Sequence, residues 1–299
     1  MTAPLHAVRT WAEMVKLSHS VFALPFALIA TFLAGRQLEG RHVPYLGQLA
    51  LIVVCMVAAR SVAMTFNRIV DAGIDARNPR TAMRPLPAGK ITFFAAYAML
   101  ILSIITFGAG CLGFAVFYDN HWPILLAGPV LVYLAGYSFT KRFTKWSHLY
   151  LGSAIALAPG AAWLAIHPAS FGAEALLLMF IVTCWIGGFD IMYACQDIEV
   201  DRREGLHSLP SRIGPRAALR AVRVCHAIVV AALICLGWVA GLGAWYAIGV
   251  ALAAALLIVE NALVRADDFR HINVAFFTIN GIVSLVLAAA SITDVLLRR

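Results

Sequence analysis

Residues 67–89 read NRIVDAGIDARNPRTAMRPLPAG and lie between two long apolar segments of the chain. Within this first motif, Asn67, Asp71 and Asp75 recur every four residues. If the preceding apolar helix continues through the motif, this spacing places the three side chains on one helix face. Two carboxylates one turn apart suit a hard divalent cation that shares its other ligand positions with phosphate oxygens. The first motif therefore predicts a metal site.

Arginine side chains surround this carboxylate pair. Four of them belong to the first motif, namely Arg68, Arg77, Arg80 and Arg84. Guanidinium groups carry a permanent positive charge and match the geometry of phosphate oxygens. Carboxylates and arginines in one short stretch predict a polyanionic ligand that is bridged by metal.

The second half of the chain repeats this arrangement. The second motif, residues 193–214, reads YACQDIEVDRREGLHSLPSRIG. Its Asp197 and Asp201 follow Asp71 and Asp75 by 126 residues. We interpret the repeat as an internal duplication, in which two pseudo-repeated halves each offer a carboxylate pair to one central site.

The composition excludes an ordinary soluble protein. Hydrophobic residues make up 62% of the 299 residues, charged residues make up 13%, and the mean hydropathy is +0.85. These values predict a polytopic membrane protein. Apolar runs of roughly 18 or more residues, long enough to cross about 30 Å of hydrocarbon, occur about nine times. They are residues 18–35, 46–66, 91–117, 122–140, 148–166, 174–195, 221–240, 243–263 and 272–297.

The positions of Lys and Arg predict the orientation. One set of predicted loops holds eighteen of them, whereas the other set holds four, which are Arg36, Arg41, Arg298 and Arg299. Because cytoplasmic loops carry the excess of positive charge, we expect the N-terminus and both motifs to be cytoplasmic. The net charge of +8 is therefore mostly a topology signal, and we predict no nucleic-acid partner. The six Cys all lie in apolar runs and predict neither a disulfide framework nor a zinc site.

The motifs also indicate a class of reaction. Carboxylate pairs, Mg²⁺ and arginines at the cytoplasmic end of a membrane cavity fit a diphosphate ester with a long apolar tail. Coordination by metal neutralises the diphosphate and makes it a good leaving group, so that an allylic carbocation forms without a protein nucleophile. A secondary transporter is the alternative, because transporters also contain repeats and charged residues within the membrane. The concentration of ionisable residues at the cytoplasmic ends favours the enzyme.

These residues also resemble a known family. N-x-x-x-D-x-x-x-D at 67–75, followed by RNPRTAMRPLPAG, together with Y-x-x-x-D-x-x-x-D at 193–201, resembles the UbiA superfamily of intramembrane prenyltransferases. The resemblance implies an all-α fold that forms a single domain over residues 1–299. Its nine or so spans surround a central cavity, with the two motifs facing each other beneath cytoplasmic cap loops. It also implies Mg²⁺-dependent transfer of a polyprenyl group from polyprenyl diphosphate to an aromatic acceptor in the cell inner membrane.

The resemblance implies a role for individual residues. The residues expected to bind metal and diphosphate are Asn67, Asp71 and Asp75 in the first motif and Asp197 and Asp201 in the second. The residues expected to contact diphosphate oxygens or to close the cap are Arg68, Arg80 and Arg84. The residues expected to help place the acceptor or the diphosphate are Lys141, Arg142 and Tyr193.

Within the superfamily, the sequence is most similar to the 4-hydroxybenzoate polyprenyltransferase branch of quinone biosynthesis. The second motif is also similar to a group associated with menaquinone synthesis, whose acceptor is 1,4-dihydroxy-6-naphthoate. Both aromatic acids therefore stand as candidate acceptors. The sequence predicts neither the prenyl chain length nor an oligomeric state.

Overall fold

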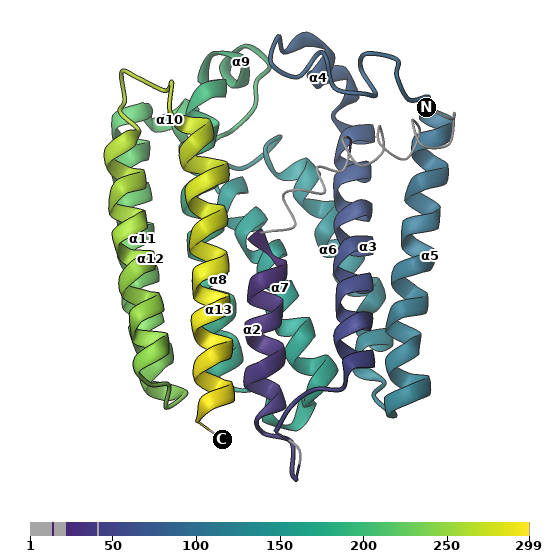
Figure 1. Cartoon of the computed structure of the whole chain (residues 1–299). Helices are drawn as coiled ribbons and strands as arrows, with labels where there is room; N and C mark the ends of the chain where they lie inside the picture. Colours follow the sequence, from purple (N-terminus) through teal and green to yellow (C-terminus); the bar gives the residue numbers. More distant parts are fainter. Residues whose placement is uncertain (1–13, 15–21, 41, 299) are drawn as a thin grey trace, which may run out of the picture. The chain divides into compact units, whose positions relative to one another are not determined.

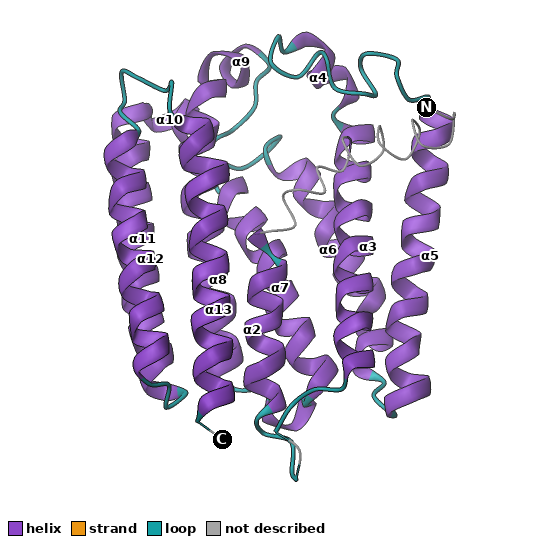
Figure 2. Cartoon of the chain, in the orientation of Figure 1, coloured by secondary structure: helices purple, strands orange, loops and turns teal. Residues whose placement is uncertain are grey.

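The computed structural model describes Met14, residues 22–40 and residues 42–298. These residues form helices and loops, with one isolated bridge between Arg265 and Asp268 and no strand (Figure 2). The helices are α2 (Leu24–Gly35), α3 (Leu46–Val70), α4 (Ala72–Arg77), α5 (Phe93–Tyr118), α6 (Trp122–Thr140), α7 (Ser147–Ile166), η2 (Pro168–Ser170), α8 (Ala173–Ala194), η3 (Cys195–Asp197), α9 (Ile198–Arg203), α10 (Leu209–Ile213), α11 (Pro215–Val239), α12 (Ala244–Leu263), η4 (Val274–Ile279) and α13 (Asn280–Leu297). The predicted all-α fold is confirmed.

The long helices coincide with the predicted membrane spans. In the described part of the chain, eight helical segments are long and apolar enough to cross a membrane. The shorter apolar helix α2 lies within the predicted first span, whose residues 18–21 are outside the described residues. The prediction of a polytopic membrane protein with about nine spans is therefore confirmed.

Several helices extend beyond the apolar runs. Helix α3 continues to Val70, and α11 begins at Pro215, before the apolar run at 221. Hydropathy marks only the part of a helix that suits hydrocarbon, whereas backbone hydrogen bonding continues into polar flanking residues. Proline at the first helical positions of α11 is favourable because its missing N–H has no partner within the helix there.

The outer surfaces of the spans are apolar. Phe94 on α5 is 85% exposed and Trp238 on α11 is 86% exposed. Large apolar side chains that remain exposed on a folded protein are unfavourable in water and favourable against lipid. These exposed faces match the lipid-facing surface of a membrane protein.

The chain divides into two compact units. The first contains Met1–Ser20 and Ala50–Ser138, and the second contains Val21–Leu49 and Phe139–Arg299. In Figure 1, α3 and α5 lie side by side in the first unit, and α12 and α13 lie near each other in the second. The first motif belongs to the first unit and the second motif to the second unit. The single domain and the central cavity between the halves stay predictions.

The first unit is packed by small and apolar side chains. Ala58 of α3, Phe107 of α5 and Ala127 of α6 form one buried cluster. A Cβ atom placed on Gly110 of α5 would lie 2.7 Å from the Sγ of Cys55 on α3. Glycine at this contact allows α5 to approach α3 closely, as small residues do between membrane helices.

The second unit contains an even closer helix contact. A Cβ atom placed on Gly152 of α7 would lie 2.2 Å from the carbonyl oxygen of Thr183 on α8. The backbones of α7 and α8 therefore touch at this glycine. This contact positions the N-terminal part of α7 beside the C-terminal part of α8, which leads into the second motif.

Candidate functional site

The first motif begins at a break in a membrane-spanning helix. Asp71 separates α3 from α4, and its φ of −95° and ψ of 4° lie between the helical and extended regions. Helical hydrogen bonds nevertheless continue across the break. The N–H of Asp71 donates to the carbonyl oxygen of Asn67 at 2.9 Å, and the N–H of Asp75 donates to that of Asp71 at 2.8 Å. Successive turns thus continue through a local distortion.

The second motif contains the same break. Asp197 precedes α9 with a φ of −104° and a ψ of 7°. Helix α9 begins and ends 126 residues after the corresponding ends of α4. Asp75 and Asp201 occupy the same position in the two short helices, and both are buried. The local structure therefore repeats at the offset that the duplication predicts.

Arginines compensate the buried carboxylate of the first motif. The Nη1 of Arg84 donates to both carboxylate oxygens of Asp75, at 2.7 and 2.8 Å. The Nη1 of Arg68 lies 3.9 Å from the Oδ2 of Asp75. The hydroxyl of Thr81 donates to the carbonyl oxygen of Asp75 at 2.9 Å. These contacts hold the loop after α4 against the short helix.

A chain of side-chain hydrogen bonds orients the other carboxylate. The Nη1 of Arg68 donates to the Oδ1 of Asn67 at 3.1 Å. The Nδ2 of Asn67 then donates to the Oδ2 of Asp71 at 2.7 Å. Because the amide oxygen accepts from arginine, its nitrogen faces the carboxylate. The predicted group of Asn67, Arg68, Asp71, Asp75 and Arg84 is therefore assembled within the first unit.

The second motif leaves a buried carboxylate oxygen without a donor. Asp201 is 3% exposed, and its Oδ2 has no hydrogen-bond partner among the described residues. An uncompensated buried carboxylate is costly, so a cation at this position would stabilise it. Asp197, four residues earlier, is also buried. The second motif thus has the oxygen ligands that a hard cation requires.

These carboxylates fit Mg²⁺ that is shared with a phosphate ligand. Among the described residues, no three His, Cys, Asp or Glu side chains lie together as a metal cage. Mg²⁺ usually takes one or two carboxylates and completes its shell with phosphate oxygens and water. Two carboxylates in each motif therefore suit Mg²⁺ with a diphosphate better than an isolated structural ion.

The segment after α6 contacts the second motif through its backbone. The N–H of His207 donates to the carbonyl oxygen of Lys141 at 2.6 Å. The side chain of Arg142 is exposed, and its guanidinium carbon lies 5.5 Å from the centre of the Phe139 ring. The structure thus brings residue 141 to the second motif, whereas the substrate roles of both side chains stay predictions.

Arg80 lies at the outer surface of the first motif. Its side chain is exposed, and its backbone N–H donates to the Oδ1 of Asn78 at 3.0 Å. Aspartate and asparagine side chains stabilise turns in this way. Arg80 therefore belongs to a defined turn, and its contact with diphosphate stays a prediction.

His148 is a residue of the site region that sequence reasoning missed. It is buried at the start of α7, and its Nδ1 lies 2.7 Å from the Oδ2 of Asp190 on α8. Its Nε2 accepts a hydrogen bond from the N–H of Leu209 at 3.3 Å. Because Nε2 is an acceptor, we assign the proton to Nδ1. His148 therefore connects two helices to the loop of the second motif, a tertiary contact that no sequence spacing reveals.

Aromatic rings pack beside the second motif. Tyr193, one turn before the break, lies 4.3 Å from Phe276 between ring centres, and Phe189 lies 5.0 Å from Phe276. The members of this aromatic cluster are Phe22, Trp185, Phe189, Tyr193, Phe276 and Phe277. Of these rings, Tyr193 is named in the sequence analysis, whereas the two rings of η4 come from the last span and follow only from the structure.

A buried hydrogen-bond network holds the π-helix that presents two of these rings. Phe276 and Phe277 belong to η4, a π-helical turn, and such turns are rare and frequent at functional sites. The Nδ2 of Asn280 donates to the Oε1 of Glu260 at 2.6 Å and to the carbonyl oxygen of Ala275 at 3.1 Å. Glu260 and Asn280 are both 0% exposed. Asn280 therefore ties α12 to the π-turn.

Comparison with known proteins identifies relatives over most of the chain. The sequence model of the UbiA prenyltransferase family matches residues 26–282. A 4-hydroxybenzoate octaprenyltransferase from Alkalilimnicola ehrlichii is 28% identical over 277 residues, which are 90% of this chain and 91% of that protein. A 4-hydroxybenzoate octaprenyltransferase from Methylococcus capsulatus is 31% identical and covers 80% of this chain and 77% of its own length.

Solved structures share the fold. The apo structure of a UbiA homolog from Aeropyrum pernix K1 has a TM-score of 0.79 and 30% identity, and covers 92% of this chain and 98% of that one. A UbiA homolog from Archaeoglobus fulgidus bound to GPP and Mg²⁺ has a TM-score of 0.67 and 18% identity, with coverage of 96% and 99%. The second likeness shows the fold alone.

The Glu260–Asn280 network generates a prediction about stability. Asn280→Ala removes both hydrogen bonds of the amide, and we expect it to lower the free energy of unfolding by about 1–2 kcal/mol. Glu260→Gln keeps an oxygen that accepts from Asn280, and we expect its free energy of unfolding to remain close to that of the unmodified protein. Thermal unfolding in detergent measures both effects. An unchanged melting temperature for Asn280→Ala, or an equal loss for Glu260→Gln, contradicts the assignment.

Proposed function

The chain belongs to the UbiA prenyltransferase family, and we propose that it transfers a polyprenyl group from polyprenyl diphosphate to an aromatic acid, with 4-hydroxybenzoate as the favoured acceptor. Membership of the family makes the chain a prenyltransferase rather than a transporter. The names of the curated relatives support the choice of acceptor. The observation that carries the proposal is the repeated helix break, which puts buried carboxylates at the end of an apolar span in each motif.

The first motif is suited to the diphosphate. Asp75 is already compensated by Arg84, whose guanidinium has further N–H donors available beyond the Nη1 that binds the carboxylate. Arg80 adds an exposed guanidinium in the same motif. We therefore assign Arg68, Arg80 and Arg84 to the recognition of diphosphate oxygens. Their permanent charges also stabilise the negative charge that develops on the leaving diphosphate.

The second motif is suited to the cation. The unpartnered oxygen of Asp201 requires positive charge, and none of the arginines that the structure describes binds it as Arg84 binds Asp75. We assign Asp197 and Asp201, together with Asn67, Asp71 and Asp75, to Mg²⁺. When bound, Mg²⁺ supplies Lewis-acid stabilisation of the diphosphate leaving group. A UbiA homolog that shares the fold was solved with GPP and Mg²⁺, which supports a divalent metal as the cofactor.

The aromatic cluster is suited to the prenyl group. Departure of diphosphate leaves an allylic carbocation, and ring faces attract a cation by about 0.5–2 kcal/mol each. Tyr193 is the ring of this cluster that lies nearest in sequence to Asp197, and Phe276 packs against it. We propose that Tyr193 helps to position the reacting carbon or the acceptor ring. Lys141 and Arg142 are the candidate partners of the acceptor carboxylate.

The membrane orientation completes the proposal. The eighteen Lys and Arg residues of one set of loops support a cytoplasmic location for the N-terminus and both motifs. This orientation presents the carboxylates to water-soluble acceptor and Mg²⁺, while the prenyl tail of the diphosphate stays in hydrocarbon. The bilayer is therefore the source of one substrate and the cytoplasm is the source of the other. Because the relatives named above are bacterial, we propose that this protein lies in the cell inner membrane.

The two motifs generate a prediction about activity. Asp71→Asn and Asp197→Asn each remove a carboxylate charge, and we expect each to lower kcat/KM for prenyl transfer by at least about 10³-fold. The control is Asp268→Asn, in a loop outside both motifs. Hydrogen bonds from Arg270 lower the pKa of Asp268, so this variant also removes a full charge. Transfer of radiolabelled prenyl groups measures the effect. Full activity in either motif variant contradicts the assignment.

The acceptor is tested by product analysis. Membranes that contain the protein are incubated with Mg²⁺, polyprenyl diphosphates of several lengths, and either 4-hydroxybenzoate or 1,4-dihydroxy-6-naphthoate. We expect prenylated 4-hydroxybenzoate by mass spectrometry. If only prenylated naphthoate forms, the acceptor is the naphthoate and the assignments of the site residues are unchanged. The absence of both products contradicts the proposed acceptor class.

A further inference from the structure

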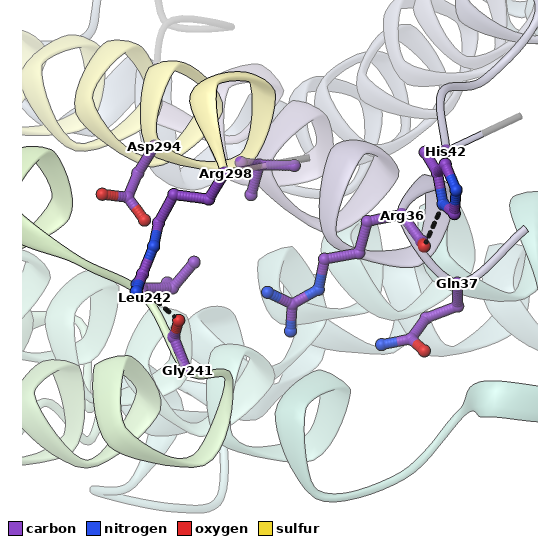
Figure 3. Close-up of a pocket in the computed structure, with 8 residues that line it drawn as sticks. Arg36, Gln37, His42, Gly241, Leu242, Asp294 and Arg298 are labelled. Atoms are coloured by element: carbon purple, nitrogen blue, oxygen red, sulfur yellow. Dashed lines mark hydrogen bonds between the residues drawn. The ribbon is translucent and has the colours of Figure 1, made fainter.

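A cavity of about 440 Å³ lies in the second unit, and all the residues that line it belong to that unit. Its polar lining includes Arg36, Gln37, His42 and Arg298 (Figure 3). Arg36 directly follows α2, and Arg298 directly follows α13. The cavity is therefore built from helix ends, where a span meets the polar surface of a membrane.

The cavity lies at the end of the unit opposite the second motif. Arg36 binds Glu174, which is in the first turn of α8. Asp197 lies at the other end of the same helical segment. A helix of this length spans about 35 Å, close to the thickness of the hydrocarbon core. The cavity is thus separate from the proposed site of prenyl transfer.

The two arginines are held in place by fixed partners. The Nη2 of Arg36 donates to both oxygens of Glu174, each at 3.0 Å. The Nη1 of Arg298 donates to the carbonyl oxygen of Gly241 at 2.7 Å. A Cβ atom on Gly243 would lie 2.7 Å from the same Nη1, so the guanidinium occupies space that only glycine leaves. Each guanidinium has five N–H donors, and these contacts leave several for a ligand.

The carboxylate in the cavity wall accepts its hydrogen bonds from backbone N–H groups. Asp294 is buried, and its Oδ2 accepts a hydrogen bond from the N–H of Gly243 at 2.7 Å. Its Oδ1 accepts from the N–H of Tyr246 at 3.4 Å. Asp294 thus compensates the positive end of α12, where carboxylates are stabilising. The guanidinium of Arg298 keeps N–H donors beyond the one that binds the carbonyl oxygen of Gly241.

The distribution of charge along the chain supports a ligand. The predicted non-cytoplasmic side holds only four basic residues, and all belong to two short segments, 36–41 and 298–299. Arg36 and Arg298 of these segments meet at the cavity, whereas 41 and 299 are outside the described residues. Basic residues are depleted on this side of membranes, so the positive-inside rule does not account for these two arginines.

We propose that this cavity binds a phosphate group at the non-cytoplasmic membrane surface, with a phospholipid head group as its source. Guanidinium groups bind phosphate through paired N–H donors. Basic pockets between membrane helices on the cytoplasmic side bind anionic head groups, and the same pairing of guanidinium and phosphate applies to a basic cavity at the opposite surface. Gln37 and His42 add neutral polar groups to the same wall. A bound head group would connect the ends of α2 and α13 through its phosphate oxygens.

The test uses the purified full-length protein in lipid-free detergent. Its melting temperature is measured during titration with phosphatidylglycerol, with inorganic phosphate and with diacylglycerol. Arg298→Gln is the main variant, and Arg298→Lys, which keeps the charge but loses the planar fork, is the second. Arg220→Gln is the matched control. It removes an exposed arginine near the start of α11, whereas the cavity lies beyond the other end of that helix, at Gly241.

We expect phosphatidylglycerol to raise the melting temperature, and Arg298→Gln to weaken its apparent affinity about tenfold, with a smaller loss for Arg298→Lys. The control and the rate of prenyl transfer should not change. Stabilisation by phosphatidylglycerol alone supports the head group, whereas equal stabilisation by inorganic phosphate supports the phosphate site and rejects the lipid source. Equal effects of diacylglycerol, or equal losses in the Arg298→Gln and Arg220→Gln variants, overturn the proposal.

Discussion

Asp71 and Asp197 each stand where a membrane-spanning helix leaves its regular path, and the proposed chemistry depends on these two breaks. A span must pair its own backbone groups because hydrocarbon offers no hydrogen bonds. At Asp71 the backbone departs from helical angles while the hydrogen bonds to residues four positions apart persist. The carboxylates are therefore carried on the ends of rigid helices rather than on loops. Rigid support of this kind favours precise positioning of charged ligands.

The two breaks are alike in backbone and different in electrostatics. In the first motif, Arg84 and Arg68 compensate Asp75, so the motif combines its carboxylates with an excess of guanidinium charge. In the second, Asp201 keeps a buried oxygen without a donor. One repeat is thus adapted to an anion and the other to a cation. In the proposed function, the first motif contributes most of the positive charge for the diphosphate, and the second contributes an uncompensated carboxylate for the metal.

Much of this architecture could be predicted from the sequence because it follows from local rules. Apolar length predicts the spans, and the spacing of four residues predicts that Asn67 lies beside Asp71, as their hydrogen bond shows. The break itself could not be predicted, because the residue at each break is an aspartate, Asp71 or Asp197, rather than a proline or glycine. His148 and Asn280 were also missed. Their roles come from tertiary contacts with Leu209 and Glu260, and single residues in apolar runs carry no periodic signal.

We propose that both carboxylate pairs act on one metal-bound diphosphate, and binding of an unreactive polyprenyl thiolodiphosphate provides a direct test. Its Kd is measured with and without Mg²⁺ for the unmodified protein, Asp75→Asn, Asp201→Asn and the double variant. We expect Mg²⁺ to tighten binding, each single variant to lose most of this effect, and the double variant to lose little more. Binding that is independent of Mg²⁺, or losses that simply add, would contradict a shared site.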